Sequence, residues 1–490
     1  MSASIATFFY ASLILGLFWL DRDYRARASV AVWIPVIWLS LAGSRSVSEW
    51  LYLTPPAASA EALLEGDPIN RLVYICLIVL GLIVLLFRGL KVLKLLQTNG
   101  AVVVFLLYCA LSLTWADYPD AGFKRWVKVV GDFVMVLIVV SDRDPSVAIR
   151  WLLARTGFLL IPLSVLMIKY YPDLARYYDR WEWSTYYSGV TTNKNALGVI
   201  CLLFGLAAAW QFLEALSGRD PTGRGRRLIA HGLMLAMVIW LFRLAHSMTA
   251  LACFLLGIVV LLVVSFRLRL RKPLMALTVE SRSIVRTPLI VHVLVACLIA
   301  VPSAVLFIGI EGILQMMGKD PTLTDRTLIW GLVLSMTTNT WFGTGFENFW
   351  LGSRLDKIWS MYSWGPNQAH SGYVEIFLNL GWIGIALLAI ILVVGYRTVI
   401  TGLHRFPSTG GLMLAYFVIG IIFNFTEAAF FRIMHPVWFV LLLAITRIPD
   451  VQRPRQLPPS GPRRAERAAP VRVGVYEDIR QHAVPVSRSA

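Results

Sequence analysis

The chain has few charged residues for its length. Of its 490 residues, 15% are charged and 58% are hydrophobic, and the mean hydropathy is +0.69. Soluble globular chains are about 25% charged and about 45–50% apolar, so much of this surface must face a solvent other than water. The apolar residues gather in runs of about 15–20 residues, close to the length of a membrane-crossing helix. The composition therefore predicts an all-α, polytopic integral membrane protein surrounded by the lipid bilayer.

The motifs of several large enzyme classes are missing. The sequence contains no Walker loop, no Gly-x-Ser-x-Gly elbow, no His-Glu-x-x-His pair and no paired Cys-x-x-Cys. ATP-driven chemistry, serine hydrolysis and zinc catalysis therefore have no support in the sequence. The five cysteines lie singly within apolar runs, so we expect no disulfide, no metal site and no cofactor.

The net charge of +17 comes largely from basic residues in short loops, which predicts membrane orientation and no nucleic-acid partner. Twenty Lys and Arg residues lie in alternate loops, at 21–28, 88–100, 142–150, 215–227, 267–287 and 396–411. Because cytoplasmic loops carry the excess of Lys and Arg, these loops are predicted to be cytoplasmic. The remaining loops, including the two long ones at 170–196 and 310–372, are then external.

We expect 12 or 13 transmembrane helices. The candidate spans are 4–20, 29–43, 72–87, 101–115, 129–141, 152–169, 197–214, 228–242, 249–266, 288–309, 373–395, 412–425 and 433–446. The first resembles a signal peptide but lacks a basic start and a small-residue cleavage site, so it is expected to be retained. Residues 1–448 are predicted to form one transmembrane domain. Residues 449–490, rich in Pro, Arg, Ala and Ser, are predicted to be a disordered basic tail in the cytoplasm.

The long external loop and the apolar run after it contain polar, aromatic and glycine residues in a distinctive order. They are Arg326, Trp330, Gly343, Gly345, His370 and Ser371 in the loop, then Gly381 and Gly384 in the run. Arg326 opens an amphipathic segment that could lie on the membrane surface. This order resembles the signature of the O-antigen ligase and polymerase superfamily. The resemblance covers about residues 100–445, with residues 310–372 as the catalytic loop.

Two weaker matches lie upstream. The stretch from Gly189 to Gly198, with Lys194 and Asn195, resembles the family's Asn-Leu-Gly element. The stretch Trp115–Pro119, followed by Lys124 and Arg125, resembles its early external loop. The Asn-Lys-Asn element and the absence of a later Thr-x-x-Gly favour the exopolysaccharide-polymerase branch.

One position departs from the family pattern. Many members have Ser-Arg-Thr-Ala before a membrane helix, and here Met248 occupies the place of that arginine. Arg243 and His246 are the nearby cations that could replace it in binding a phosphate.

The resemblance implies a metal-independent, inverting glycosyltransferase in the bacterial inner membrane, active at the periplasmic face. Its donor would be a glycan on undecaprenyl diphosphate and its acceptor another glycan, with a chain-length regulator as a candidate partner. Arg326 would stabilise the diphosphate leaving group, since a guanidinium fork matches phosphate oxygens. His370 would take the proton of the attacking hydroxyl. Residues expected to bind substrate are Lys124, Arg125, Lys194, Asn195, Arg243, His246, Glu347 and Ser371.

Other interpretations remain open from the residues alone. Arg326 could anchor its segment at the membrane interface, and Lys194 and Asn195 could cap the following helix. The aromatic residues of the external loops suit either the headgroup region or stacking on sugars. The function could be polymerisation of repeat units or ligation of an O-antigen onto the lipid A core. A secondary transporter or lipid-glycan flippase would share the helices, but it would require ionisable residues at mid-membrane depth.

Overall fold

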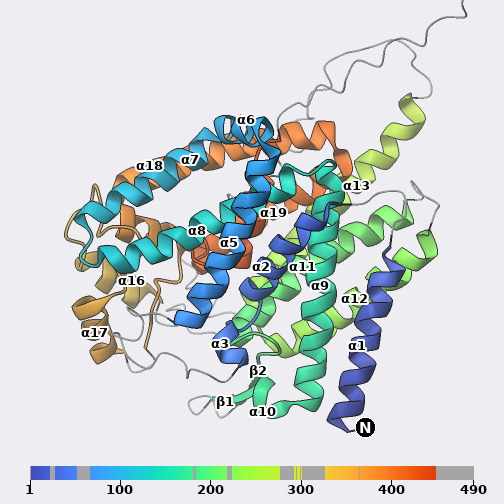
Figure 1. The fold of residues 1–490 in the computed structure, drawn as a ribbon, viewed down its shortest axis with the longest axis horizontal. Helices are drawn as coiled ribbons and strands as arrows, with labels where there is room; N and C mark the ends of the chain where they lie inside the picture. The colour runs from blue at the N-terminus through green and yellow to red at the C-terminus, as the bar shows by residue number, and fades with distance from the viewer. Residues whose placement is uncertain are drawn as a thin grey trace, which may run out of the picture. The chain divides into compact units, whose positions relative to one another are not determined.

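The computed structural model describes residues 2–22, 28–51, 67–179, 184–217, 223–275, 326–362 and 365–448, with a few residues between 292 and 300. These residues are mostly helical (Figure 1). The α-helices are α1 Ala3–Leu20, α2 Trp33–Ala42, α3 Val47–Trp50, α5 Pro68–Arg88, α6 Leu90–Thr98, α7 Gly100–Ser112, α8 Pro119–Val140, α9 Pro145–Tyr170, α10 Pro172–Ala175, α11 Lys194–Leu216, α12 Arg224–Ala245, α13 Met248–Met275, α16 Arg326–Ser335, α17 Gly352–Met361, α18 Gly372–Arg405, α19 Pro407–Thr426 and α20 Pro436–Ile445. Short 3-10 helices lie at Val30–Val32 and Leu113–Trp115, and β1 (Arg176–Asp179) pairs antiparallel with β2 (Ser184–Tyr187).

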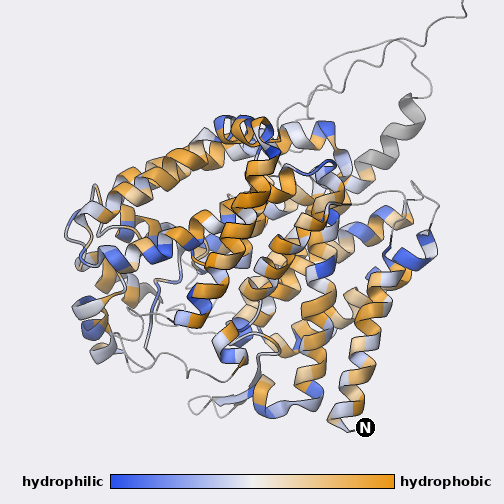
Figure 2. Ribbon diagram, viewed as in Figure 1, coloured by the Kyte–Doolittle hydropathy of each residue, from blue (hydrophilic) through white to orange (hydrophobic). Residues whose placement is uncertain are grey.

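Eight of the described helices are long and apolar enough to cross a membrane. They correspond to the predicted spans 4–20, 72–87, 152–169, 197–214, 228–242, 249–266, 373–395 and 412–425. Figure 2 shows that such helices are hydrophobic along most of their length, for example α5. The protein is therefore a multi-pass, all-α membrane protein, as the composition predicts.

The other predicted spans take different forms. The spans 29–43 and 433–446 are short apolar helices, at Val30–Ala42 and Pro436–Ile445. The span 101–115 is one arm of a pair, Leu90–Thr98 and Gly100–Trp115, that is bent by 81°. The span 129–141 forms the buried second half of α8. The span 288–309 and the tail 449–490 lie outside the described residues.

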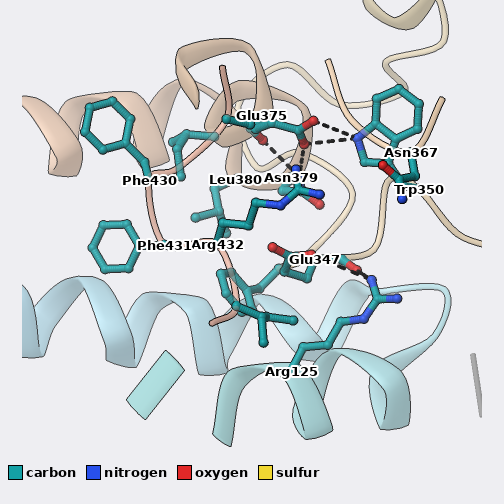
Figure 3. Close-up of a pocket in the computed structure, with 14 residues that line it drawn as sticks. Arg125, Glu347, Trp350, Asn367, Glu375, Asn379, Leu380, Phe430, Phe431 and Arg432 are labelled. Atoms are coloured by element: carbon teal, nitrogen blue, oxygen red, sulfur yellow. Dashed lines mark hydrogen bonds and ion pairs between the residues drawn. The ribbon is translucent and has the colours of Figure 1, made fainter. Parts of the chain in front are cut away.

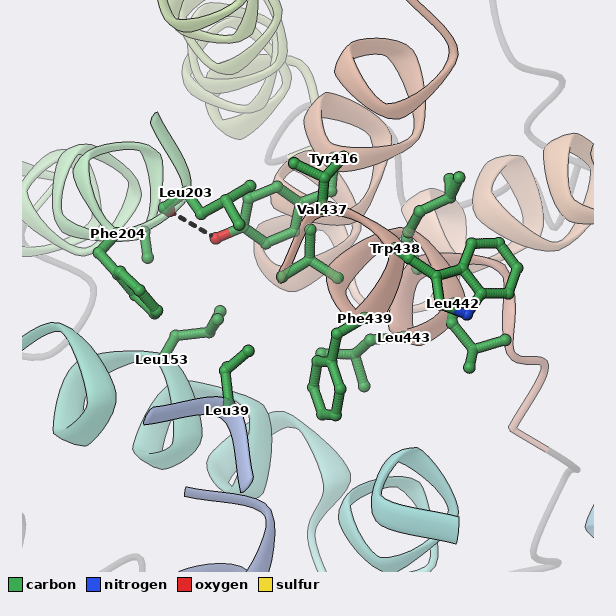
Figure 4. Packing of buried hydrophobic residues seen from close by; sticks show 14 of the residues in the cluster. Leu39, Leu153, Leu203, Phe204, Tyr416, Val437, Trp438, Phe439, Leu442 and Leu443 are labelled. Carbon is green, nitrogen blue, oxygen red and sulfur yellow. Dashed lines mark hydrogen bonds between the residues drawn. The ribbon is translucent and has the colours of Figure 1, made fainter. Parts of the chain in front are cut away.

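The centre of the protein is a packed apolar core. Helices α9, α11 and α19 are buried along most of their length, whereas α1 and α5 leave most of their side chains exposed, as lipid-facing helices do. Figure 4 shows Tyr416 and Val437 packed near Leu203 in this core, and the Tyr416 hydroxyl donates to the Leu203 carbonyl over 2.8 Å. That bond satisfies a hydroxyl that would otherwise be costly to bury.

Charged groups inside the helical bundle are paired near its predicted cytoplasmic end. Asp21, which caps α1, lies 3.1 Å from His231 of α12 and 4.0 Å from Arg155 of α9. Arg155, which lies within the predicted span 152–169, is therefore part of a buried ionic cluster that ties three helices together. Arg88 pairs in the same way with the buried Asp142, over 3.3 Å.

The long loop before α18 folds into a small lobe with its own apolar cluster. Ile329 and Val333 of α16 pack with Leu355 and Ile358 of α17, together with Leu378 of α18. This second cluster holds α16 and α17 against the first turns of α18, on the left of Figure 1. The predicted catalytic loop is therefore, over its described part, a folded element with a fixed position on α18.

Cysteine labelling tests the orientation of this lobe. In a background without Cys76 and Cys297, a Ser353→Cys variant is expected to react with a membrane-impermeant maleimide in intact cells, because Ser353 is exposed on α17. A Ser281→Cys variant, at a position outside the described residues, is expected to react only after the membrane is permeabilised, because its loop is strongly basic. Labelling of Ser281→Cys in intact cells would contradict the predicted orientation.

Candidate active site

His370 lies at the junction between the external lobe and α18. Its Nδ1 atom is 3.2 Å from Oε2 of Glu427, and both side chains are mostly buried, with 19% and 13% of their surfaces exposed. His370 has a positive φ of 49°, a conformation that costs energy for a residue with a side chain. Ser371, directly after it, is the N-cap residue of α18 and is buried.

The segment that carries Glu427 folds back on itself after α19. The side-chain oxygen of Asn424 accepts hydrogen bonds from the backbone N–H groups of Ala429 and Phe430, over 2.8 and 2.9 Å. Asn424 lies so close to Gly372 that a Cβ there would meet it at 1.9 Å, so only glycine fits. The asparagine therefore fixes the 427–435 loop against the start of α18, which places Glu427 beside His370.

The 427–435 loop also carries Arg432 and His435. Arg432 donates a hydrogen bond to the side chain of Gln368, two residues before His370. His435 is the N-cap residue of α20, and the centre of its ring lies 5.9 Å from that of Phe423.

The glycines of the signature build a break in α18. Helix α18 is interrupted at Gly381, where φ is +63° and ψ is −161°. The freed backbone groups bond to the loop 340–345: the N–H groups of Thr344 and Gly345 donate to the carbonyls of Leu378 and Asn379, and that of Trp382 donates to Thr340. The two chains approach so closely that a Cβ at Gly343 would lie 2.4 Å from the Asn379 backbone. These glycines are thus required by geometry, and they fix the external lobe to the membrane helix.

A Gly343→Ala variant is expected to lose much of its stability. Gly343 has a φ of +69°, which costs a residue with a side chain about 1–2 kcal/mol, and its new methyl group would collide with backbone. Thermal unfolding in detergent should show a lower midpoint and less monodisperse protein.

Gly331→Ala provides the matched control for that measurement. Gly331 lies in α16 with no atom within 4 Å of an added Cβ, so alanine should stabilise the helix by about 0.5–1 kcal/mol. Equal midpoints for Gly343→Ala and Gly331→Ala would contradict the close approach of loop and helix.

A cavity of about 240 Å³ lies beside this break (Figure 3). Its polar lining residues are Arg125, Glu347, Asn367, Glu375, Asn379 and Arg432, and its aromatic ones are Phe346, Trp350, Phe430 and Phe431. They come from the start of α8, the lobe, the first turns of α18 and the 427–435 loop. Figure 3 shows the Arg432 side chain between those of Glu375 and Glu347, with Arg125 beyond Glu347.

Hydrogen bonds hold each charged group of the cavity in place. Arg125 donates to the backbone carbonyl of Glu347 over 2.6 Å and lies 3.7 Å from its carboxylate. Glu375 accepts from the indole N–H of Trp350, with both oxygens 3.0 Å away, and from the backbone N–H of Ala369. The cavity is therefore preorganised, with carboxylates and guanidinium groups that meet any ligand without rearrangement.

Arg326 opens the helix that rests against His370. The helix α16 begins at Arg326, and its Trp330 donates a hydrogen bond to the carbonyl of Ala369 over 2.6 Å. Arg326 therefore lies one helical turn from Trp330, which bonds to the residue immediately before His370. The side chain of Arg326 lies outside the part of the chain that the structure describes, so its predicted role remains a prediction.

The other predicted binding residues lie around the cavity in different ways. Arg125 and Glu347 line it, and Ser371 lies at the base of α18, while Lys124 is exposed on the outer side of α8. Lys194 and Asn195 open α11, with the Lys194 ammonium 3.5 Å above the ring of Tyr186, and the helix is capped by Asn193. Arg243 and His246 are exposed at the corner between α12 and α13 and do not line the cavity.

A short chain of contacts connects the corner between α12 and α13 with Glu427, the partner of His370. Thr249, at the start of α13, lies 3.4 Å from Thr426, and Thr426 directly precedes Glu427. Gly198 of α11 packs against Ser247, since a Cβ at Gly198 would lie 2.6 Å from that side chain. The segment Gly189–Gly198 and the α12–α13 corner therefore pack against each other, next to the segment that carries Glu427.

Four residues of the site were missed by sequence reasoning. They are Glu375, Asn379, Glu427 and Arg432. A signal existed for Glu427 and Arg432, because both lie in the short loop between two apolar runs that the charge pattern predicts to be external. Glu375 and Asn379 lie within an apolar run, and their approach to the cavity depends on how the helix packs.

Comparison with known proteins found two sequences similar to parts of this chain. Residues 230–389, which include His370 and the glycines of the loop–helix contact, match the family model described as O-antigen ligase. The chain is also 23% identical over 304 residues to the exopolysaccharide production protein ExoQ of Rhizobium meliloti strain 1021. That match covers 60% of this chain and 64% of the relative, just under two thirds of its length. Over its matched region the chain is therefore similar to the O-antigen ligase family, and over 60% of its length it is similar to an exopolysaccharide production protein.

Proposed function

We propose that this protein is a glycosyltransferase of the bacterial inner membrane that polymerises oligosaccharide repeat units at the periplasmic face. The donor is a repeat unit on undecaprenyl diphosphate, and the acceptor is a second glycan. The observation that carries this proposal is the His370–Glu427 pair, held beside a cavity lined by guanidinium, carboxylate and aromatic groups. The pair supplies a base, and the lobe around it comes from loops that the charge pattern predicts to be external.

The reaction is a direct displacement. The acceptor hydroxyl attacks the anomeric carbon of the donor, and the bond from that carbon to the diphosphate oxygen breaks, with inversion of the anomeric centre. With Nδ1 of His370 held by Glu427, Nε2 is the ring nitrogen that takes the hydroxyl proton. Arg326 stabilises the negative charge that develops on the departing diphosphate.

Two observations bear on polymerase versus ligase. The relative named for exopolysaccharide production supports polymerisation, while the family model is described as O-antigen ligase. The Asn193-Lys194-Asn195 element favours polymerisation, which we take as the function; ligation onto the lipid A core is the second candidate.

Reconstitution tests the proposal. Purified protein in nanodiscs is given lipid-linked repeat units extracted from its host, in buffer that contains a chelator of divalent cations. The expected product is a ladder of chain lengths on gels. Transfer of one unit to added lipid A core, without a ladder, would support the ligase function. If the lipid-linked unit were consumed with neither acceptor, the proposal that the protein is an enzyme would be contradicted.

A further inference from the structure

The cavity beside Gly381 has room for one sugar residue and little more. Its volume of about 240 Å³ lies below the range of about 300–1,000 Å³ that is usual for pockets of drug-sized ligands. The cavity is built on helix ends and on a loop fixed by Asn424, so its shape is set before a ligand arrives. It therefore suits recognition of a single terminal unit.

The charges of the cavity argue against a diphosphate. Both guanidinium groups of the cavity already have partners. Arg125 donates to the carbonyl of Glu347 and lies 3.7 Å from its carboxylate, and Arg432 donates to Gln368. A diphosphate would have to compete with these partners and would lie beside the carboxyl groups of Glu347 and Glu375.

The same groups suit the hydroxyls of a sugar. Each hydroxyl both donates and accepts, so it can donate to the carboxylate of Glu347 and accept from the guanidinium of Arg432. Phe430 and Trp350 add apolar faces on which the C–H face of a sugar ring can rest. The cavity thus offers alternating acceptors and donors around one aromatic-lined space.

The cavity and the base share their supporting backbone. Ala369, which precedes His370, donates to Glu375, and Arg432 lies in the same short loop as Glu427. On this geometry, and resting on the proposed function above, we propose that the cavity binds the terminal sugar of the glycan acceptor. The lipid diphosphate binds outside this cavity. The cavity thereby positions the attacking hydroxyl for His370 and selects which sugar is extended.

Protection of an introduced cysteine tests this assignment without turnover. Asn367 lines the cavity and is exposed, so an Asn367→Cys variant should fold and react with a soluble methanethiosulfonate reagent. The background lacks Cys76 and Cys297, the exposed native cysteines. The two probes are oligosaccharide repeat units released from the host's polysaccharide and undecaprenyl diphosphate. At a concentration ten times its Kd, a ligand that covers the site slows labelling about 11-fold.

We expect the oligosaccharide to slow labelling of Asn367→Cys and undecaprenyl diphosphate to leave it unchanged. Ser353→Cys, exposed on α17 and not among the cavity residues, is the matched control and should label at the same rate with either probe. Protection by undecaprenyl diphosphate would overturn the proposal, and so would protection by neither probe. The experiment is repeated with His370→Ala added, so that binding of the acceptor is judged separately from whether His370 catalyses the proposed reaction.

Discussion

The His370→Ala variant is expected to lose about 10²–10⁴-fold in turnover of lipid-linked repeat units, the usual loss when a general base is removed. Its folding and membrane insertion should be preserved, because the His370 side chain lies at the edge of the lobe and alanine leaves the packing of the apolar core unchanged. The measurement is initial rate with purified protein in nanodiscs, with thermal unfolding of the same samples. Alanine at a positive φ still carries strain, so a small drop in the unfolding midpoint is compatible with the catalytic role.

Two further variants separate catalysis from structure. His404→Ala, an exposed histidine in the last turn of the same helix, should retain the rate of the unmodified protein. The rate of Glu427→Gln should lie between those of His370→Ala and His404→Ala. The glutamine amide can donate to Nδ1 of His370, which favours the tautomer whose Nε2 cannot take a proton. If stable His370→Ala protein turned over repeat units at the normal rate, the assignment of His370 as the catalytic base would be wrong.

The Arg326→Ala variant is expected to lose about 10²–10³-fold, as for removal of one preorganised group that stabilises a developing negative charge. The defect should appear in kcat with natural donor, because the interaction grows stronger as the diphosphate departs. Helix α16 should stay in place, because Ile329 and Val333 remain packed and Trp330 keeps its bond to Ala369.

Arg326→Lys should recover only part of this activity, since an ammonium group cannot reproduce a bidentate guanidinium. Lys357→Ala provides the matched control, because Lys357 is an exposed cation of the same lobe, on α17, and lies outside the cavity. An anchoring role predicts a different result: poor expression of Arg326→Ala, full specific activity in the surviving protein, and complete rescue by lysine.

Much of the fold could be predicted because membrane insertion is decided by local sequence. A helix of apolar residues satisfies its own backbone hydrogen bonds, so a run such as 72–87 specifies a membrane helix whatever its neighbours are. The same reasoning misjudges runs whose surroundings decide their form. The run 433–446 became a short helix, α20, enclosed by other helices, and the run 101–115 joined a bent pair. Hydropathy records apolar character but does not record whether lipid or protein covers it.

The glycine pattern could be read from the sequence, but its physical reason could not. Gly343 and Gly381 lie 38 positions apart in the chain. Their order pointed to the family, yet only the structure shows that they let a loop and a broken helix approach within backbone contact. At both positions a positive φ is combined with backbone too close for a Cβ atom, so only glycine fits, which explains why a pattern of small residues accompanies a charged site.

The sequence by itself determined that this is a multi-pass membrane protein, and it singled out His370, Arg125 and Glu347 as site candidates. Hydropathy and loop charge act locally, so they can be read along the chain. Only the tertiary structure decided that Glu427 meets His370 and that Arg432 and Glu375 complete the cavity. Those contacts join segments about 60 residues apart, and they depend on how α18 breaks and how Asn424 folds the loop back. Such geometry follows from packing between helices, which no single stretch of sequence contains.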